Sequence, residues 1–272
     1  MNKTAHSVRG FCYTRYMSWA ARRRLLILLI VGSAVAALLA IVLIAAFYKA
    51  PSCVDGVQNQ GESGIDCGGP CPYLCTAEEQ PPTVLFTQAL SNGSGRTDII
   101  ASVENKNIDA AARNVPYRIM LYGPDQSFLK EITGTLDLPP GATVPVYVPG
   151  ALYGGNVASA FLDIASSSPK WFALASDPRI VPAVGNTNVS GTAFAPRIEA
   201  VLTNPGVTML TDVLAVVLVR GTNGNVIAAS QTIVPAIPAQ GRGIATFTWN
   251  SAFSDTPASI EVVPIVPLPS YP

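Results

Sequence analysis

Ile99-Ile-Ala-Ser-Val-Glu-Asn105 is a short apolar run that ends in asparagine, and it can be laid over a second run, Ile198-Glu-Ala-Val-Leu-Thr-Asn204. The strand and turn from Asn114 to Gly123 can be laid over Asp212 to Gly221 in the same way. The offset between such segments stays between 98 and 100 residues. A constant offset over several segments indicates that one structural unit is duplicated.

Residues 83–272 show short apolar runs separated by turn signals, and no helical period occurs there. In the first copy the runs cover residues 84–89, 99–104, 115–122, 128–136, 144–148 and 157–164. Runs of this length and spacing are typical of antiparallel β-sandwiches. We therefore expect an all-β fold with two tandem antiparallel β-sandwich domains, over residues 83–176 and 177–272.

The order of signals inside each copy is distinctive. One strand ends in Asn, a long apolar strand reaches Tyr122 and turns at Asp125, and Pro-Pro-Gly precedes a later strand. This order is similar to that of small FxLYD or immunoglobulin-like (Ig-like) modules found on bacterial and archaeal surface proteins. In the second copy Asn223-Gly224 fits the turn, whereas Arg220 stands where the first copy has Tyr122. The resemblance implies a fold and no particular chemistry.

The run from Leu25 to Tyr48, LLILLIVGSAVAALLAIVLIAAFY, is twenty-four residues long and carries no charge. About twenty apolar residues suffice to cross the hydrocarbon core, so the run predicts one transmembrane helix with the lipid bilayer as its partner. Arginines occupy positions 22–24, and after Lys49 the next basic residue is Arg96. By the positive-inside rule, residues 1–24 are a basic cytoplasmic tail and the later domains are extracytoplasmic.

Two further properties of this run stay open. A cleaved signal peptide or a lipoprotein anchor is the alternative, although a signal peptide has a shorter apolar region of roughly seven to fifteen residues. Gly32, Ala36 and Ala40 recur every fourth residue, a spacing that lets two helices approach closely. The stripe suggests a homo-oligomer, but alanine is so common in membrane spans that chance explains it equally well.

The charge is low and unevenly distributed. Charged residues make up 12% of the chain, with seventeen basic and seventeen acidic side chains. From residue 50 onward, ten basic residues stand against seventeen acidic ones. A nucleic-acid-binding domain needs a basic face, so we expect no nucleic-acid partner.

Four cysteines, Cys53, Cys67, Cys71 and Cys75, lie just after the apolar run, in a segment that spans residues 49–82 together with a linker. An even number of cysteines outside a membrane predicts two disulfides, and three pairings are possible. A four-thiolate zinc site is the alternative, although such sites commonly have closer paired spacings.

The text around these cysteines resembles a short motif, roughly CxDGxxNxxExGxDCGGxC, that recurs in surface and secreted proteins. Its polar residues Asp55, Asn59, Glu62 and Asp66 recur every three or four positions, with glycines between them. Oxygen ligands at such intervals suit Ca²⁺, which takes about six to eight of them. The alternative is that these side chains only build turns in a segment too small to hold a core.

Candidate binding and catalytic residues are few. Trp171 and Phe172 lie in the segment that joins the two copies, where an exposed aromatic pair would contact a sugar ring or a protein partner and a buried pair would pack between the domains. The single histidine, His6, lies in the predicted cytoplasmic tail, so no Ser-His-Asp arrangement is expected outside. We expect no enzyme and no cofactor, apart from the Ca²⁺ alternative.

The sequence thus predicts a single-pass protein of the cell membrane that displays a disulfide-bonded segment and two sandwiches at the cell surface. A non-catalytic role is expected, in cell-envelope assembly or in docking a protein partner. The alternatives are a calcium-dependent adhesion module and a surface hydrolase that uses carboxylates. The sequence leaves the partner's identity open.

Overall fold

The structure is a computed structural model that describes residues 18–48, 52–91, 95–165, 169–174, 176–191 and 193–270. It divides into two compact units, Met1–Ser52 and Cys53–Pro272, and the second is called the β unit below. Residues 1–17 of the predicted basic tail lie outside the described residues.

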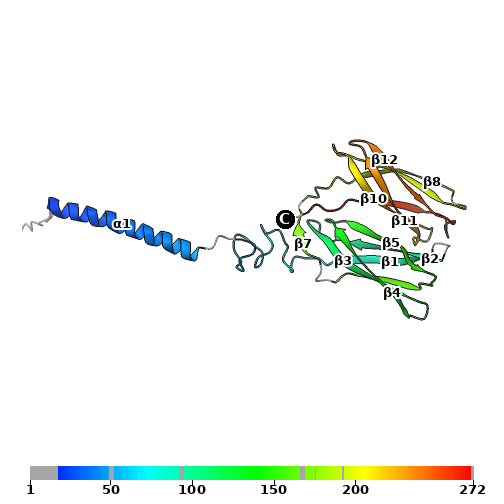
Figure 1. The fold of residues 1–272 in the computed structure, drawn as a ribbon, viewed down its shortest axis with the longest axis horizontal. Coiled ribbons are helices and arrows are strands. Elements are labelled where there is room, and N and C mark those ends of the chain that lie inside the picture. Colours follow the sequence, from blue (N-terminus) through cyan, green and yellow to red (C-terminus); the bar gives the residue numbers. More distant parts are fainter. Residues whose placement is uncertain are drawn as a thin grey trace, which may run out of the picture. The chain divides into compact units, whose positions relative to one another are not determined.

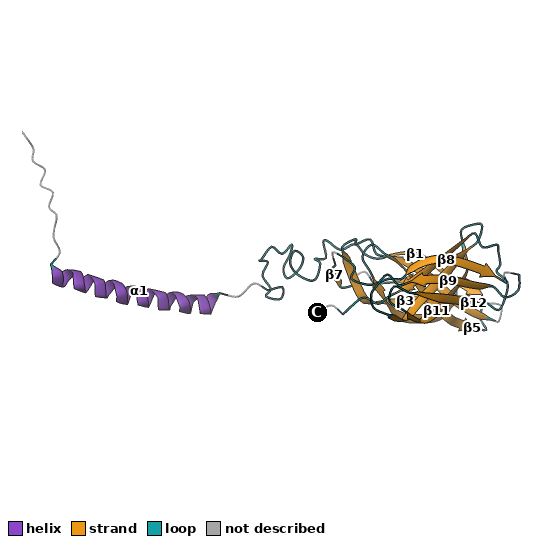
Figure 2. Ribbon diagram, turned by 90° about the horizontal axis from the view of Figure 1, so that it is seen from above, coloured by secondary structure: helices purple, strands orange, loops and turns teal. Residues whose placement is uncertain are grey.

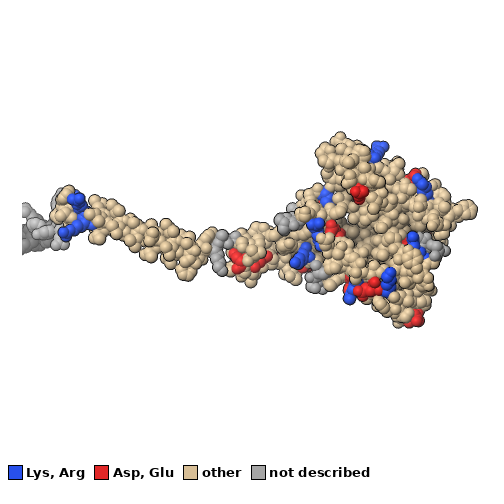
Figure 3. All heavy atoms as spheres, viewed as in Figure 1, with Lys and Arg blue, Asp and Glu red and all other residues tan. Residues whose placement is uncertain are grey.

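Helix α1 (Trp19–Phe47) contains the predicted transmembrane run except its last residue, Tyr48, which caps the helix, and it is long and apolar enough to cross a membrane. It begins six residues before Leu25, because Ser18 caps it by accepting a hydrogen bond from Ala21 N–H and because arginine is a good helix former. Among the described residues of this unit, the charged side chains are confined to the start of the helix (Figure 3). Every described side chain from Leu25 to Phe47 is exposed, as lipid contact would require.

The first sandwich is built from two antiparallel sheets (Figure 1). One sheet contains, in spatial order, β1 (Thr83–Ser91), β2 (Arg96–Glu104) and β5 (Thr143–Tyr153). The other contains β4 (Phe128–Leu138), β3 (Ala110–Tyr122) and β6 (Ser159–Asp163), and a short strand, β7 (Trp171–Ala173), also pairs with β3.

The second sandwich repeats this arrangement. Its first sheet contains β12 (Arg242–Thr248), β9 (Arg197–Thr203) and β8 (Ala183–Ser190). Its second sheet contains β11 (Val226–Ile237), β10 (Leu210–Arg220) and β13 (Ser259–Ile265). The predicted fold class, all-β with one preceding helix and a small disulfide-rich segment, is confirmed.

The duplication extends to the backbone of single residues. Ile99 lies opposite Val148, and Ile198 lies opposite Phe247, so both partners are displaced by 99 positions. A positive φ recurs at Asn114 (49°) and Asp212 (51°), which begin the aligned segments. Non-glycine residues adopt this conformation rarely, so its recurrence at matched positions indicates one ancestral turn geometry.

The asparagine that ends each aligned run has a clear structural role. Asn105 is buried, and its Nδ2 donates to the carbonyls of Ala110 (2.8 Å) and Pro139 (2.7 Å). Asn204 makes the equivalent bonds to Thr208 (2.7 Å) and Pro238 (3.0 Å). Asn105 therefore joins the loop after β2 to the loop after β4, and Asn204 joins the loop after β9 to the loop after β11.

Replacing Asn105 by alanine is expected to lower the free energy of unfolding of the β unit by about 2–4 kcal/mol, because buried carbonyls lose their donor. Asn204→Ala should cost a similar amount. The control is Asn223→Ala, an exposed turn residue that accepts one bond from Asn225 N–H and should cost less than about 1 kcal/mol. Urea denaturation measures all three, and equal losses at Asn105 and Asn223 would contradict the role given to Asn105.

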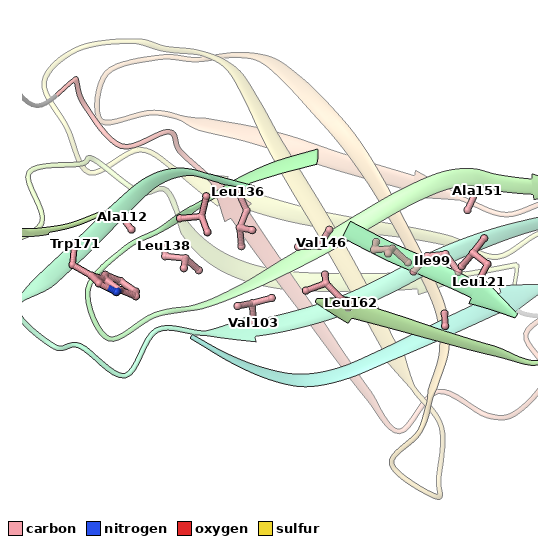
Figure 4. Close-up of a cluster of buried hydrophobic side chains, with 14 of the residues drawn as sticks. Ile99, Val103, Ala112, Leu121, Leu136, Leu138, Val146, Ala151, Leu162 and Trp171 are labelled. Atoms are coloured by element: carbon pink, nitrogen blue, oxygen red, sulfur yellow. The ribbon is translucent and has the colours of Figure 1, made fainter. Parts of the chain in front are cut away.

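Three apolar clusters lie between the four sheets, one inside each sandwich and one between the two sandwiches. One cluster fills the first sandwich and contains Ile99, Val103 and Trp171 (Figure 4), and a second fills the other sandwich. A third, around Ile100 of β2 and Val216 of β10, joins the two sandwiches. The outer face of the β1-β2-β5 sheet therefore packs on the outer face of the β11-β10-β13 sheet, and this contact is called the joint below.

Candidate functional site

The cysteine-rich segment is closed by two disulfides, Cys53–Cys71 and Cys67–Cys75. The predicted disulfides are confirmed, and the structure selects one of the three possible pairings. Gly69 in this segment has a φ of +57°, and a side chain there would collide with the carbonyl oxygen of Gly61. The Gly-Gly pair of the motif is thus required by a tight turn.

The four polar residues predicted to bind Ca²⁺ come close together, and their side chains are engaged in hydrogen bonds. Asp66 accepts from the N–H groups of Asp55 (3.0 Å) and Gly56 (3.0 Å). Glu62 accepts from the N–H groups of Asn59 (3.3 Å) and Asp66 (3.2 Å), and Asn59 Nδ2 donates to Asp55 (2.9 Å). These bonds support the turn-building alternative, and calcium binding stays a prediction.

Among the described residues, Cys53, Glu62 and Cys71 are a group of potential metal ligands that lie within 4.8 Å of one another. Both sulfurs belong to one disulfide, so neither is a thiolate that would bind a metal. This group therefore carries no metal chemistry while the disulfide is intact.

Backbone hydrogen bonds attach the cysteine-rich segment to the first sandwich. Leu74 N–H donates to the carbonyl of Trp171 (3.0 Å), and Ala173 N–H donates to that of Pro72 (2.9 Å). Strand β7 thus lies between β3 and the segment. The segment and the sandwich form one compact unit, which no feature of the linker composition predicted.

Of the two alternatives for the aromatic pair, exposed or buried, the structure shows a buried pair, so the partner-binding interpretation of Trp171 and Phe172 is wrong. Trp171 is only 1% exposed and packs in the core of the first sandwich, while Phe172 is 3% exposed. Phe172 contacts a small cluster with Ala111 and Leu268, beside the C-terminal segment (Figure 2). Because β7 belongs to a sheet, its successive side chains are buried on opposite sides, and neither is available to a partner.

Polar contacts accompany the apolar joint between the sandwiches. The guanidinium of Arg220 lies 5.3 Å from the ring centre of Phe86, a cation–π contact. Gln88 Nε2 donates to the carbonyl of Val226 (2.7 Å). Contacts of both kinds give the joint a defined register, as in a specific interface.

A buried carboxylate, Asp98, lies in β2 close to the joint. It accepts hydrogen bonds from the hydroxyl of Tyr147 (2.9 Å) and from Gly150 N–H (2.7 Å), and it forms an ion pair with Arg96 (3.0 Å). Burial and the negative charge of Asp98 raise the pKa of the Tyr147 hydroxyl. The pairing register of β5 with β2 shifts between Val148 and Leu152, and the bond from Gly150 to Asp98 holds this irregular part of β5 in place.

A cavity of about 350 Å³ opens at the joint and is lined mainly by apolar and aromatic side chains, among them Tyr117, Tyr147 and Val216. Its one carboxylate, Asp137, already accepts hydrogen bonds from Asn114 N–H (2.9 Å) and Leu268 N–H (2.8 Å). This cavity brings no pair of acidic groups together for hydrolytic chemistry.

Within the described residues of the β unit, nothing packs on the outer faces of two sheets, and these faces are the candidate docking surfaces. On the β4-β3-β6 face, Tyr122 makes edge-on contacts at 6.0 Å with Phe128 (58% exposed) and Phe161 (55% exposed). On the β12-β9-β8 face, Ile244 is 61% exposed. Sequence reasoning identified Tyr122 by its motif and missed Phe128 and Phe161, which a search for exposed apolar residues on paired strands would have found.

Helix α1 leaves Gly32, Ala36 and Ala40 exposed along one side of the helix, as their spacing predicted. No atom of the described residues lies within 4 Å of the position that a side chain at Gly32 would occupy. Helix–helix packing through this stripe stays a prediction.

Comparisons with known proteins give no functional assignment. No family model matches the chain, and no curated protein matches it. Among solved structures, a red sea bream transglutaminase is similar with a TM-score of 0.23 and 15% identity, over 70% of this chain and 32% of that one. A putative β-galactosidase from Bacteroides fragilis gives a TM-score of 0.18 and 9% identity, over 80% of this chain and 39% of that one. The chain thus spans about a third of the length of these structures, and such weak similarity does not bear on activity.

Proposed function

We propose that this chain is a single-pass membrane protein with a cytoplasmic N-terminus, which presents the β unit outside the cell in a non-catalytic docking or structural role. One observation carries the proposal: an apolar helix of 29 residues is followed within a few positions by a segment closed by two disulfides. Disulfides persist in oxidising compartments outside the cytoplasm. The arginines at 22–24 lie at the opposite end of the apolar run, where cytoplasmic residues are expected.

The arrangement of the β unit supports docking over catalysis. Two of its carboxylates accept hydrogen bonds from backbone groups and so hold loops: Asp98 binds Gly150, and Asp137 binds Asn114 and Leu268. The exposed features are flat sheet faces with aromatic and aliphatic side chains, which are typical of surfaces that contact proteins.

The topology is tested with a membrane-impermeant maleimide on intact cells that express the chain. In a Cys12→Ala variant that carries Ser251→Cys in an exposed loop, we expect labelling without permeabilisation. In the unaltered chain, Cys12 should react only after permeabilisation. The reverse pattern would refute the proposed orientation, and loss of α1 from the mature chain, read by mass spectrometry, would refute the anchor.

A further inference from the structure

The duplication relates the joint to the two sheet faces that stay uncovered. At the joint, the β1-β2-β5 face of the first sandwich packs on the β11-β10-β13 face of the second. In the first sandwich, the β4-β3-β6 face is the equivalent of the β11-β10-β13 face. In the second sandwich, the β12-β9-β8 face is the equivalent of the β1-β2-β5 face. Each molecule therefore ends in two faces that correspond to the two halves of its own joint.

Strand pairing defines which residues are equivalent. Strands β3 and β6 of the first sandwich correspond to β10 and β13 of the second. Arg118 in β3 pairs with Asp163 in β6, and Val216 in β10 pairs with Val263 in β13, so Arg118 is the equivalent of Val216. In the other sheets, Gln88 pairs with Ile100 and Asn188 pairs with Glu199, so Glu199 is the equivalent of Ile100. Ile100 and Val216 lie in the same buried cluster at the joint. The free faces thus replace a buried apolar pair by Glu199 and Arg118, which have opposite charges.

Two further positions repeat this substitution. Asp98 and Ala229 line one small cavity at the joint, and their equivalents on the free faces are Arg197 and Glu131. Thr143 and Val263 line another, and their equivalents are Arg242 and Asp163. At these three positions, a basic residue on one free face corresponds to an acidic residue on the other.

Apolar side chains occupy the region between these charges. At the joint, Pro145 and Arg220 line one cavity, and their equivalents on the free faces are Ile244 and Tyr122. Ile244 and the ring of Phe161, beside Tyr122, are more than half exposed. An apolar centre with charged residues around it is the usual composition of a specific protein interface.

From this correspondence we propose that the chain associates with a second copy of itself, head to tail, through the β4-β3-β6 face of one molecule and the β12-β9-β8 face of the next. The contact reuses the geometry of the joint, with charge pairs in place of its apolar pairs. The ion pairs that now lie within each face, Arg118–Asp163 (2.8 Å) and Arg197–Glu199 (2.6 Å), are exposed and gain a further partner of opposite sign. Since the two faces differ, the contact is heterologous, and each added copy leaves one face free to bind the next.

This inference rests on the docking role proposed above and names its partner. It does not depend on which side of the membrane the β unit occupies, so a monomeric protein with the proposed topology would refute the inference alone.

Sedimentation of the full chain in excess detergent tests the proposal. In the proposed contact, Glu131 of one molecule faces Arg197 of the next. Glu131→Arg alone therefore sets two arginines against each other, and Arg197→Glu alone sets two glutamates against each other. Each variant should lose about tenfold or more in self-association. Lys106→Glu changes an exposed loop charge outside both faces and is the matched control, expected to leave association unchanged.

Mixing the two variants gives the decisive result. In an equimolar mixture, the arginine at position 131 of one variant meets the glutamate at position 197 of the other, and Glu131 of the second variant meets Arg197 of the first. Association should therefore return to that of the unaltered chain. Failure of the mixture to associate would overturn the proposal. Monomeric behaviour of the unaltered chain would overturn it too. So would an Arg197→Glu variant that associates normally, because a contact that does not use the β12-β9-β8 face, such as packing through the α1 stripe, would ignore that change.

Discussion

Replacing Trp171 by alanine is expected to lower the free energy of unfolding of the β unit by about 3–5 kcal/mol, the usual cost of removing a large buried aromatic side chain. The indole is 1% exposed and fills one end of the first core, near Ala112 and Leu138 (Figure 4). Neighbouring strands are fixed by hydrogen bonds, so they cannot collapse into the space that the ring leaves. Urea denaturation followed by circular dichroism measures the loss.

A matched control is Trp249→Ala in the second sandwich. Trp249 is only partly buried and makes an edge-on contact with Phe253 at 5.1 Å, so its removal should cost about 1–2 kcal/mol. A loss at Trp171 no larger than that at Trp249 would contradict the placement of β7 in the first core.

Sequence reasoning found the main strands but missed β7 for a physical reason. Three residues, Trp171 to Ala173, are too short to show the alternation of apolar and polar residues that marks a strand. The segment also lies between two repeats, where a linker is the natural interpretation. Its burial depends on contacts with Ala112 and Leu74, which are distant in sequence.

The joint could have been predicted in part. The run from Ile99 to Val103 is buried on both faces, as is much of β10, whereas β9 alternates between buried and partly exposed residues. A continuous apolar run indicates a strand covered on both sides, and Glu199 interrupts the corresponding run in the second copy. This difference indicates which sheet of each copy is covered, but it does not show that the two covered faces meet. The disulfide pairing likewise depends on chain geometry, because four cysteines allow three pairings.

Ile100→Glu is expected to have an effect as large as that of Trp171→Ala, about 4 kcal/mol or more, because it places an ionised carboxylate among the apolar side chains of the joint. Ile100 is fully buried beside Val216 and Leu218. The carboxylate can reach water only if the sandwiches separate, so we expect thermal unfolding to change from one transition to two, one for each sandwich.

The reciprocal change, Glu199→Ile, is the control that the duplication provides. It puts the residue of the joint at the equivalent, uncovered position, where it should alter the free energy of unfolding by no more than about 0.5 kcal/mol. If Ile100→Glu also left a single transition with little loss, the joint would not hold the two sandwiches together. The same backbone position thus demands an apolar residue in one copy and accepts a charge in the other, because one face is covered within the molecule and the other is free to meet a partner.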